Sequence, residues 1–530
     1  MRAPARRFWT ECVPAAWNVA PKQERPGGSP APSDCASGGE SRPRARAPGA
    51  GSSSALLDGV RASVECGPKQ ERPGGSPALP GVRLGRRAEA AGPRTWECRA
   101  PARRSGRRSA ANHKALGRRN GAAYDAPVND TFDVLIIGGG LVGASLAIAL
   151  DGAGLAVGLA EAAPLHVDLQ PSYDERNLVL ARASVNSLEA LGVLDAAAPA
   201  VPLRRIHVSR RGDFGSVRLD AAELGLPPFG AVIPARELGN ALLRRLERCN
   251  ALERIAPARA TAIHADGGHV EVALLAGETT CRLRTRLLVG ADGTRSFVRD
   301  AFAIGSATRD YGQSAIVTTL TTERPLDGLA YERFTDAGPV ALLPLGDRRA
   351  GLVLTVPGDE AAAVAALDDE AFVAFVHQRF GWRAGRLSRT GRRKPYPLAR
   401  CLAARTTAER MVLVGNAAQT IHPVGAQGFN LGLRDALTLA ELLREAADAG
   451  TDPGAASLLA RHVARRAPDR AATAAFSDDL VRLMGNDFLP LRLARSLGLQ
   501  ALQHLTPLQR RFALRGMGYR GDAAAAGLAR

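Results

Sequence analysis

The sequence has little cysteine and no long hydrophobic run, and both absences exclude whole classes of protein. Seven cysteines occur in 530 residues, with no CxxC or histidine-linked spacing. A disulfide framework, a zinc site and a dithiol redox pair are therefore not indicated, and a reducing compartment is favoured. The longest uncharged apolar stretch, residues 134–150, contains four glycines and is shorter than the roughly 20 residues of a membrane helix.

Acidic residues are scarce in the N-terminal part of the chain. Residues 1–120 hold 23 Lys and Arg against 9 Asp and Glu, whereas the remainder is nearly balanced at 47 against 43. Most of the formal net charge of +18 therefore lies in residues 1–120, and this charge says little about the binding partners of residues 121–530.

Regular periodicity is also missing from residues 1–125, which are rich in Ala, Gly, Pro, Arg and Ser. Two short sequences, PKQERPGGSPA and RAPARR, each occur twice in this segment. The spacing between copies differs, so the segment is not a solenoid. We expect a disordered basic extension, genuine or due to a start codon assigned too far upstream. An organelle transit peptide and a nucleic-acid-binding segment are the alternatives; we expect no nucleic-acid partner.

Order begins with a β-branched run, residues 131–137, which leads into a glycine-rich turn and then into residues 144–150 of helical composition. Strand, GxGxxG turn and helix in this order form the dinucleotide-binding fingerprint. We expect Gly138 to permit the tight turn, Gly140 to let the backbone approach a pyrophosphate, and Gly143 to let the helix pack closely.

An acidic residue supports this interpretation. A second predicted strand, residues 156–160, ends at Glu161, whose carboxylate would accept hydrogen bonds from a ribose. An acid at this position favours FAD or NAD over a cofactor with a 2′-phosphate.

Two further strand-and-loop motifs follow. Residues 286–299 form an apolar strand that enters a turn at Asp292 and Gly293. Residues 411–415 form another, followed by the loop NAAQTIHPVGAQGFNLG, in which Pro423, Gly425 and Gly428 precede a helix expected over 429–446. The N-terminus of this helix would direct amides at a polar acceptor.

With these three motifs in order, residues 131–520 resemble the class A flavoprotein aromatic hydroxylases, of the para-hydroxybenzoate hydroxylase kind. The variant GNAAQT, with Asn416 and Gln419 where the family has Asp and His, is similar to the ubiquinone-biosynthesis branch, of the 2-octaprenyl-6-methoxyphenol hydroxylase type. The segments 207–212, 332–335 and 394–398 also match this branch.

The resemblance implies a set of cofactor-binding residues. GxGxxG would bind the ADP half of FAD, Asp292 and Gly293 would lie near the pyrophosphate, and the third motif would contact the ribitol and the flavin ring. Asn416 keeps an acceptor for a ribitol hydroxyl but loses the family's negative charge. The remaining candidates follow the family's pattern: Arg176, Arg236, Pro423, Gly425, Gly428 and Asn430.

The implied activity is hydroxylation of the aromatic ring of a polyprenylated phenol through a flavin C4a-hydroperoxide. The resemblance also implies NAD(P)H as a transient reductant and O2 as co-substrate. The chain has only one GxGxxG, so no second Rossmann domain is expected to house the nicotinamide. No protein nucleophile is expected. A flavin reductase or dehydrogenase that inserts no oxygen, and a non-catalytic scaffold of a quinone-biosynthesis complex, are the alternatives.

The resemblance also predicts an α/β fold, with a Rossmann-like FAD-binding domain and an interposed mixed β-sheet substrate domain. We expect FAD-binding segments at 126–205, 236–312 and 399–450, substrate segments at 206–235 and 313–398, and a helical region over 451–530. Amphipathic stretches at 488–502 and 508–515 would pack on the flavin domain, lie on a membrane or dock to partner enzymes. A cytoplasmic location is expected, with possible peripheral contact to the inner membrane or a quinone-biosynthesis complex.

Overall fold

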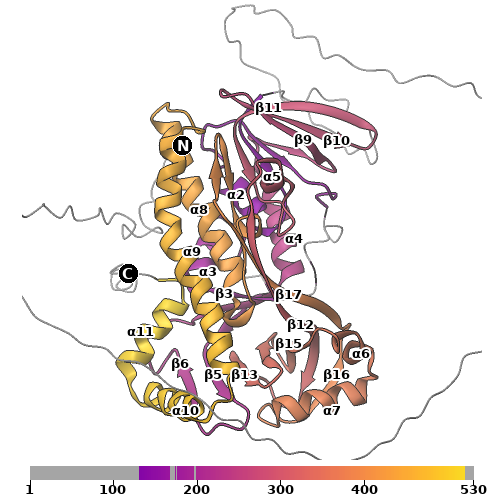
Figure 1. The fold of residues 1–530 in the computed structure, drawn as a ribbon, viewed down its shortest axis with the longest axis vertical. Helices are drawn as coiled ribbons and strands as arrows, with labels where there is room; N and C mark the ends of the chain where they lie inside the picture. Colours follow the sequence, from indigo (N-terminus) through magenta and orange to yellow (C-terminus); the bar gives the residue numbers. More distant parts are fainter. Residues whose placement is uncertain (1–130, 167–173, 175, 196–198, 520–530) are drawn as a thin grey trace, which may run out of the picture. The chain divides into compact units, whose positions relative to one another are not determined.

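The glycine-rich fingerprint lies at the centre of an eight-stranded sheet. A computed structural model describes residues 131–166, 174, 176–195 and 199–519, all within one compact unit; the predicted N-terminal extension falls outside these residues. The path β18-β19-β11-β1-β2-β8 forms the sheet, and β9 and β10 extend β11 as an antiparallel hairpin (Figure 1). Its strands are β1 (Thr131–Ile137), β2 (Val157–Ala160), β8 (Leu252–Ile255), β9 (Arg259–Ala265), β10 (Val270–Ala276), β11 (Thr279–Gly290), β18 (Thr407–Ala408) and β19 (Met411–Leu413).

From Val134 to Ile137 the core strand β1 is apolar without interruption, because both faces of the sheet are covered. Val134 and Ile136 pack against α2, α4 and α8, while Leu135 and Ile137 face the opposite side. A parallel strand buried on both faces needs this uninterrupted apolar run. The covering helices are α2 (Leu141–Ala149), α3 (Arg182–Ala190), α4 (Ala235–Leu246), α5 (Phe297–Ala301) and α8 (Gln427–Asp448).

One boundary expected from the sequence is wrong. The first helix, expected to start after the glycine turn at residue 144, begins at Leu141, so Gly143 lies within it. The chain can turn into a helix this early because Gly143 has no side chain to collide with the preceding turn.

A second, mixed sheet has nine strands in the order β20-β17-β12-β15-β14-β13-β5-β6, with β16 beside β12. Only β5 and β13 pair in parallel. The expected strands at 315–320 and 350–356 pair antiparallel within β12 and β15. The strands are β5 (Arg205–Arg210), β6 (Ser216–Asp220), β12 (Ser306–Thr322), β13 (Leu329–Thr335), β14 (Gly338–Pro344), β15 (Arg349–Pro357), β16 (Leu387–Thr390), β17 (Lys394–Ala403) and β20 (Gln419–Thr420).

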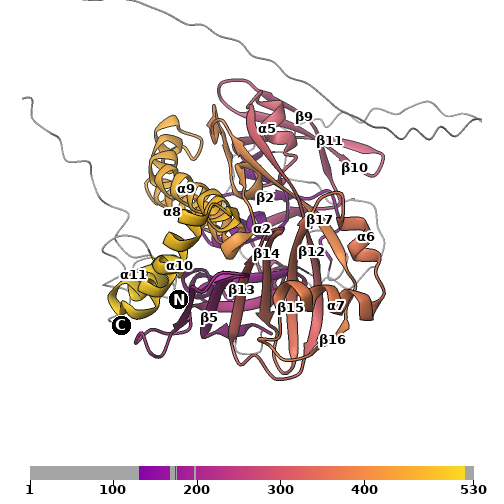
Figure 2. The same cartoon turned by 60° about the horizontal axis from the view of Figure 1, so that its bottom comes forward.

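The two faces of the mixed sheet have different surroundings. Alternate residues of β12 to β15 pack on α6 (Ala361–Ala366) and α7 (Asp369–Phe380), which cover one face (Figure 2). A small sheet of β3 (Asn177–Ala181), β4 (Val201–Leu203) and β7 (Gly230–Pro234) links the two larger ones. The predicted α/β fold, with a nucleotide-binding sheet and an interposed mixed sheet, is confirmed; the exact domain boundaries stay predictions.

Three helices complete the described chain: α9 (Ala456–Gly485), α10 (Leu489–His504) and α11 (Thr506–Gly516). Helix α9 runs beside α8, and α10 packs against β6 (Figure 1). None of the helices in the described part is both long and apolar enough to cross a bilayer.

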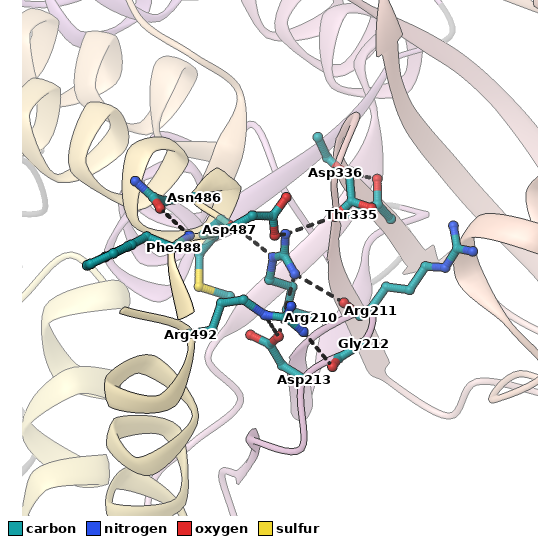
Figure 3. A network of polar contacts seen from close by, with 12 residues as sticks. Arg210, Arg211, Gly212, Asp213, Thr335, Asp336, Asn486, Asp487, Phe488 and Arg492 are labelled. Carbon is teal, nitrogen blue, oxygen red and sulfur yellow. Dashed lines mark hydrogen bonds and ion pairs between the residues drawn. The ribbon is translucent and has the colours of Figure 1, made fainter. Parts of the chain in front are cut away.

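A buried ion-pair network joins α10 to the mixed sheet (Figure 3). Arg210, at the end of β5, is 2% exposed and donates to Asp336 and to the backbone oxygen of Met484, both at 2.8 Å. Asp213 accepts from Arg495 at 2.5 Å and from Arg492 at 3.1 Å. Burial raises the pKa of Asp213, but the hydrogen bonds from Arg495 and Arg492 more than offset this and hold that pKa below its usual value.

We therefore expect Asp213→Asn to lower the free energy of unfolding by about 3–5 kcal/mol at pH 7, because it leaves the buried guanidinium group of Arg495 without its counter-charge. Asp266→Asn is the control: its pair with Arg284 lies on the surface, so its loss should change the free energy of unfolding far less. Urea denaturation at several pH values measures both.

The sign of the pH dependence follows from the lowered pKa. The stability contributed by Asp213 is present above the unfolded pKa of about 3.9 and is lost as the pH falls through the folded value, so wild type and variant should converge in acid. Equal stability of the two proteins at pH 7 would contradict the role given to the network.

Candidate FAD site

The register of the parallel sheet brings the three glycine motifs to one edge. Ile137 of β1 is paired with Ala160 of β2 on one side and with Gly290 of β11 on the other. Gly290 in turn is paired with Leu413 of β19. All four strands run parallel and end at the same level, so the loops that follow them are neighbours.

Two backbone contacts at this edge require glycine. Gly138 has φ +108°, and a Cβ added there would lie 2.5 Å from the carbonyl oxygen of Ala291. A Cβ on Gly143 would lie 1.9 Å from the carbonyl oxygen of Gly138. The roles predicted for these glycines, a tight turn and close helix packing, match this geometry.

Gly140 is the N-cap of α2. No side chain of the described residues caps this helix, and its first turn carries no acid. The amides at its N-terminus are thus placed as the fingerprint requires for a pyrophosphate.

Glu161 lies immediately beyond β2, beside the glycine turn. Its carboxylate accepts hydrogen bonds from the amide of Gly139 at 2.6 Å and from the amide of Ala163 at 2.9 Å. These bonds orient the carboxylate at the expected ribose position, since Gly139 belongs to the phosphate-facing turn.

The carboxylate of Asp292 makes its hydrogen bonds to residues that follow it closely in the chain. Its carboxylate accepts from the hydroxyl of Ser296 at 2.5 Å and from the amide of Val298 at 3.0 Å, which fixes the start of α5. Burial raises the pKa of Asp292, although these hydrogen bonds act in the opposite direction. Gly293 follows with φ +87°, so the predicted turn is present.

A single arginine joins the second motif to the third. Arg299 donates to the carbonyl oxygens of Thr294 and Ala417, at 3.0 and 3.2 Å. The third motif also touches the first helix, because Gly415, with φ +60°, lies against the side chain of Val142.

The loop before α8 contains the remaining residues of the third motif. Asn416, Pro423 and Gly425 are exposed, and Gly428 is partly buried. Gly425 has φ +70°, and Ala426 adopts a left-handed conformation as the N-cap of α8, with no side-chain cap among the described residues. The loop is thus built to present backbone groups rather than side chains.

The side chain of Asn430, on α8, connects this helix to β3. Its side chain is buried, accepts from the amide of Ala181 at 2.9 Å and donates to the carbonyl oxygens of Val179 and Ala426, each at 2.8 Å. With its amide group used in this way, Asn430 holds the loop in place.

Arg176 and Arg236 lie close together although 60 positions separate them. The amide of Arg236, at the start of α4, donates to the carbonyl oxygen of Asp174 at 3.0 Å. Arg176 pairs with Asp174 at 2.8 Å, and the hydroxyl of Tyr396 donates to the same carboxylate at 2.9 Å. Both arginine side chains keep exposed surface.

Sequence reasoning missed a buried network behind the third motif. Gln419, at the family's histidine position, donates to Asp435 and accepts from Arg470 at 2.6 Å. Arg466, 2% exposed, donates to Asp435 at 2.6 Å and to Asp469 at 2.7 Å. Because these partners come from a loop and two helices, no local pattern in the sequence could have revealed them.

His422 is buried between the loop and α9. Its Nδ1 accepts from the amide of Val424 at 3.1 Å, and its ring lies edge-on to Tyr311 at a centroid distance of 4.9 Å. Burial lowers the pKa of His422 to about 4, so the ring is neutral at neutral pH. These contacts give His422 a structural role in holding the loop.

The geometry fits a dinucleotide. Close backbone approach at Gly138, an uncapped helix N-terminus at Gly140 and an oriented carboxylate at Glu161 are the three elements that such a cofactor needs. Together with the mixed sheet, they define a flavoprotein of the FAD-dependent monooxygenase class.

Comparison with known proteins agrees. Residues 131–477 match the model of the FAD binding domain family. Ubiquinone hydroxylase UbiL of Rhodospirillum rubrum is 41% identical over 387 residues, which cover 73% of this chain and 89% of the relative. The 3-demethoxyubiquinol 3-hydroxylase of Escherichia coli is 33% identical, covering 72% of this chain and 97% of the relative. The crystal structure of p-nitrophenol 4-monooxygenase PnpA from Pseudomonas putida, 19% identical, superimposes with a TM-score of 0.63 over 74% of this chain and all of that one, which shows a shared fold.

The chain belongs to the FAD binding domain family, among its ubiquinone-pathway hydroxylases. The predicted class A FAD-dependent aromatic monooxygenase is confirmed. FAD is its cofactor, with NAD(P)H and O2 as the co-substrates of monooxygenase chemistry.

Gly143→Ala is expected to abolish FAD retention, because the new methyl group would force α2 away from the carbonyl of Gly138. Gly498→Ala is the matched control: this glycine is also helical, but a Cβ there meets nothing within 4 Å, and alanine should be neutral or stabilising by up to about 1 kcal/mol. The flavin absorbance that remains after gel filtration measures retention. Full retention by Gly143→Ala would show that this contact is not needed.

Proposed function

We propose that the protein hydroxylates the aromatic ring of a polyprenylated phenol in ubiquinone biosynthesis. The observation that carries the proposal is the 41% identity to a ubiquinone hydroxylase over 89% of that relative's length. Such coverage includes the mixed sheet as well as the FAD-binding sheet.

We infer which residues hold FAD. The amides at the N-terminus of α2, after Gly140, face the pyrophosphate, with Gly138 and Gly143 giving the close backbone approach. Glu161 accepts from the ribose, and Asp292 and Gly293 shape the turn beside them. Arg176 and Arg236 supply positive charge beside the cofactor. The loop along the ribitol and the flavin ring contains Asn416, Pro423, Gly425 and Gly428. Asn430 acts by fixing that loop to β3.

Bound FAD supplies the two-electron chemistry that uses NAD(P)H and passes one oxygen atom of O2 to the ring. The task of the protein is to hold the phenol in line and to exclude water. We assign the phenol to the face of the mixed sheet opposite α6 and α7, because the third motif's loop packs against that face through Val424 and Phe334.

The two alternatives predict different products. Incubation of the FAD-loaded full-length protein with NAD(P)H, ¹⁸O2 and a prenylated phenol should give a product that has gained one labelled hydroxyl, as read by mass spectrometry. Gly143→Ala should give none. Oxidised substrate without label would favour the dehydrogenase, and a protein that retains no FAD would favour the scaffold.

We also propose that α10 and α11 contact an anionic membrane surface. Helix α10 is inverted for a globular protein: Arg495 and Ser496 are buried, whereas Leu489, Leu493 and Leu497 are 62%, 48% and 62% exposed. Leu508 and Phe512 continue the apolar surface on α11. Exposed apolar rows of this kind mark interaction sites, and a substrate with a polyprenyl tail resides in lipid.

The charges beside this surface support an anionic lipid partner. Arg482, Arg510, Arg511 and Arg515 are exposed on α9 and α11. An interfacial helix needs both the apolar row and adjacent basic residues.

Leu493→Glu with Leu497→Glu should reduce co-sedimentation with phosphatidylglycerol vesicles by roughly tenfold or more, since both side chains would enter the acyl region. Leu275→Glu is the control, an exposed leucine on β10 far from α10 in the chain. Unchanged vesicle binding by the double variant would contradict a membrane role for this face.

A further inference from the structure

One carboxyl group lies on the interior face of the mixed sheet with no partner of its own. Glu332 is in the middle of β13. No hydrogen bond or ion pair reaches its side chain from the described residues, and no neighbouring charge contributes to its pKa. Burial alone raises the pKa of Glu332 to about 7.

The residues beside Glu332 on this face of the sheet are apolar. Paired residues of adjacent strands share a face, and the pairing places Val208 of β5 and Ala341 of β14 beside Glu332, with Val353 of β15 beyond. Val208, Glu332 and Val353 keep accessible surface although they lie in the middle of the sheet. Side chains of the described residues therefore do not close this face completely.

The segments that cover this face come from the candidate FAD site. Phe334, two residues along on the same face, packs with Val424 of the third motif and Met484 of α9. Farther along the face, a Cβ on Gly351 would lie 2.3 Å from Nδ2 of Asn177, at the start of β3. Glu332 thus lies on the face of the mixed sheet that is covered by the segments that we assign to FAD.

A half-buried carboxyl among apolar residues, with no partner from the described residues, is costly and calls for an explanation. Charged or titratable groups on the surrounding elements have other partners or are neutral. Arg210 pairs with Asp213 and Asp336, Asp174 pairs with Arg176, and Asp478 of α9 accepts from Tyr311 and Arg400. His422, buried, is neutral at neutral pH.

We propose that Glu332 contacts the substrate and is the base that removes the proton of the phenol hydroxyl during hydroxylation. This role rests on the proposed function and specifies how the site recognises a neutral phenol. The apolar residues around Glu332 suit an aromatic ring, and the carboxylate of Glu332 is the hydrogen-bond acceptor for the phenol hydroxyl.

The proton transfer to Glu332 balances within the overall hydroxylation reaction. NAD(P)H and O2 supply the electrophilic oxygen, and as the ring carbon bonds to it, the phenol O–H bond breaks. The electron pair of that bond forms the C=O of a dienone, and the proton passes to Oε of Glu332. Loss of the ring hydrogen and return of a proton to the oxygen then give the dihydroxy product, and the other oxygen atom leaves as water.

The test uses FAD-loaded wild type, Glu332→Gln and Glu332→Asp. The wild-type rate of hydroxylation of a prenylated phenol should rise with pH through an apparent pKa near 7. Glu332→Gln should lose roughly 100-fold or more in kcat and show no such rise, while NAD(P)H oxidation and KM change only a few-fold. Glu332→Asp should keep the rise with pH at a reduced rate.

A second measurement does not depend on turnover. Because the folded pKa of Glu332 lies above its unfolded value, the stability of the protonated form is lost as the pH rises through about 7. Glu332→Gln should therefore raise the Tm of the FAD-loaded protein above pH 8 and leave it unchanged near pH 5. Glu271→Gln, on β10 with a surface pair to Arg282, is the matched control and should change neither rate nor Tm.

Two results would overturn the role of Glu332: hydroxylation by Glu332→Gln at the wild-type rate and pH profile, or a Tm difference that is the same at both pH values. A wild-type enzyme that oxidises NAD(P)H but makes no hydroxylated product would instead overturn the proposed function.

Discussion

The site depends on the contact between two backbones, at Gly138 and Ala291. Parallel pairing ends β1 and β11 at the same level, through the pair Ile137 and Gly290. The loops that leave these strands then meet so closely that no side chain fits at Gly138. This contact sets the start of α2 and the turn at Asp292 together, and it fixes where phosphate groups can approach backbone amides.

The third motif follows a short strand, and polar contacts hold its loop in addition to buried apolar residues such as Ile421 and Val424. Asn430 fastens the loop to β3 through three hydrogen bonds to backbone groups. Behind it, Gln419, Asp435 and Arg466 form a buried polar network. Networks of this kind stabilise less than apolar packing but specify one arrangement when every member is satisfied.

Local pattern predicted the nucleotide-binding half of the molecule well. The run at 131–137, the glycines and Glu161 are within 31 residues of one another, and their geometry follows from strand, turn and helix rules. The mixed sheet was predicted only in part, since β5 pairs with β13 across more than 120 residues. Glu332 was visible as part of a family motif, but its isolation on an apolar face depends on three strands meeting, which no local pattern records.

Two features run against ordinary stability rules, and both lie on surfaces that we propose contact the substrate or its membrane. Helix α10 buries Arg495 and exposes leucines, and β13 places Glu332 among apolar residues. Folding alone would favour the reverse in each case. The ion pairs of Asp213 compensate for the first inversion by giving Arg495 a counter-charge. No described residue compensates for the second, so a ligand with a hydroxyl group is the partner that would satisfy Glu332. In our proposal, the apolar outer surface of α10 and α11 lies where a prenylated substrate resides, and Glu332 is the inner acceptor for its phenol hydroxyl.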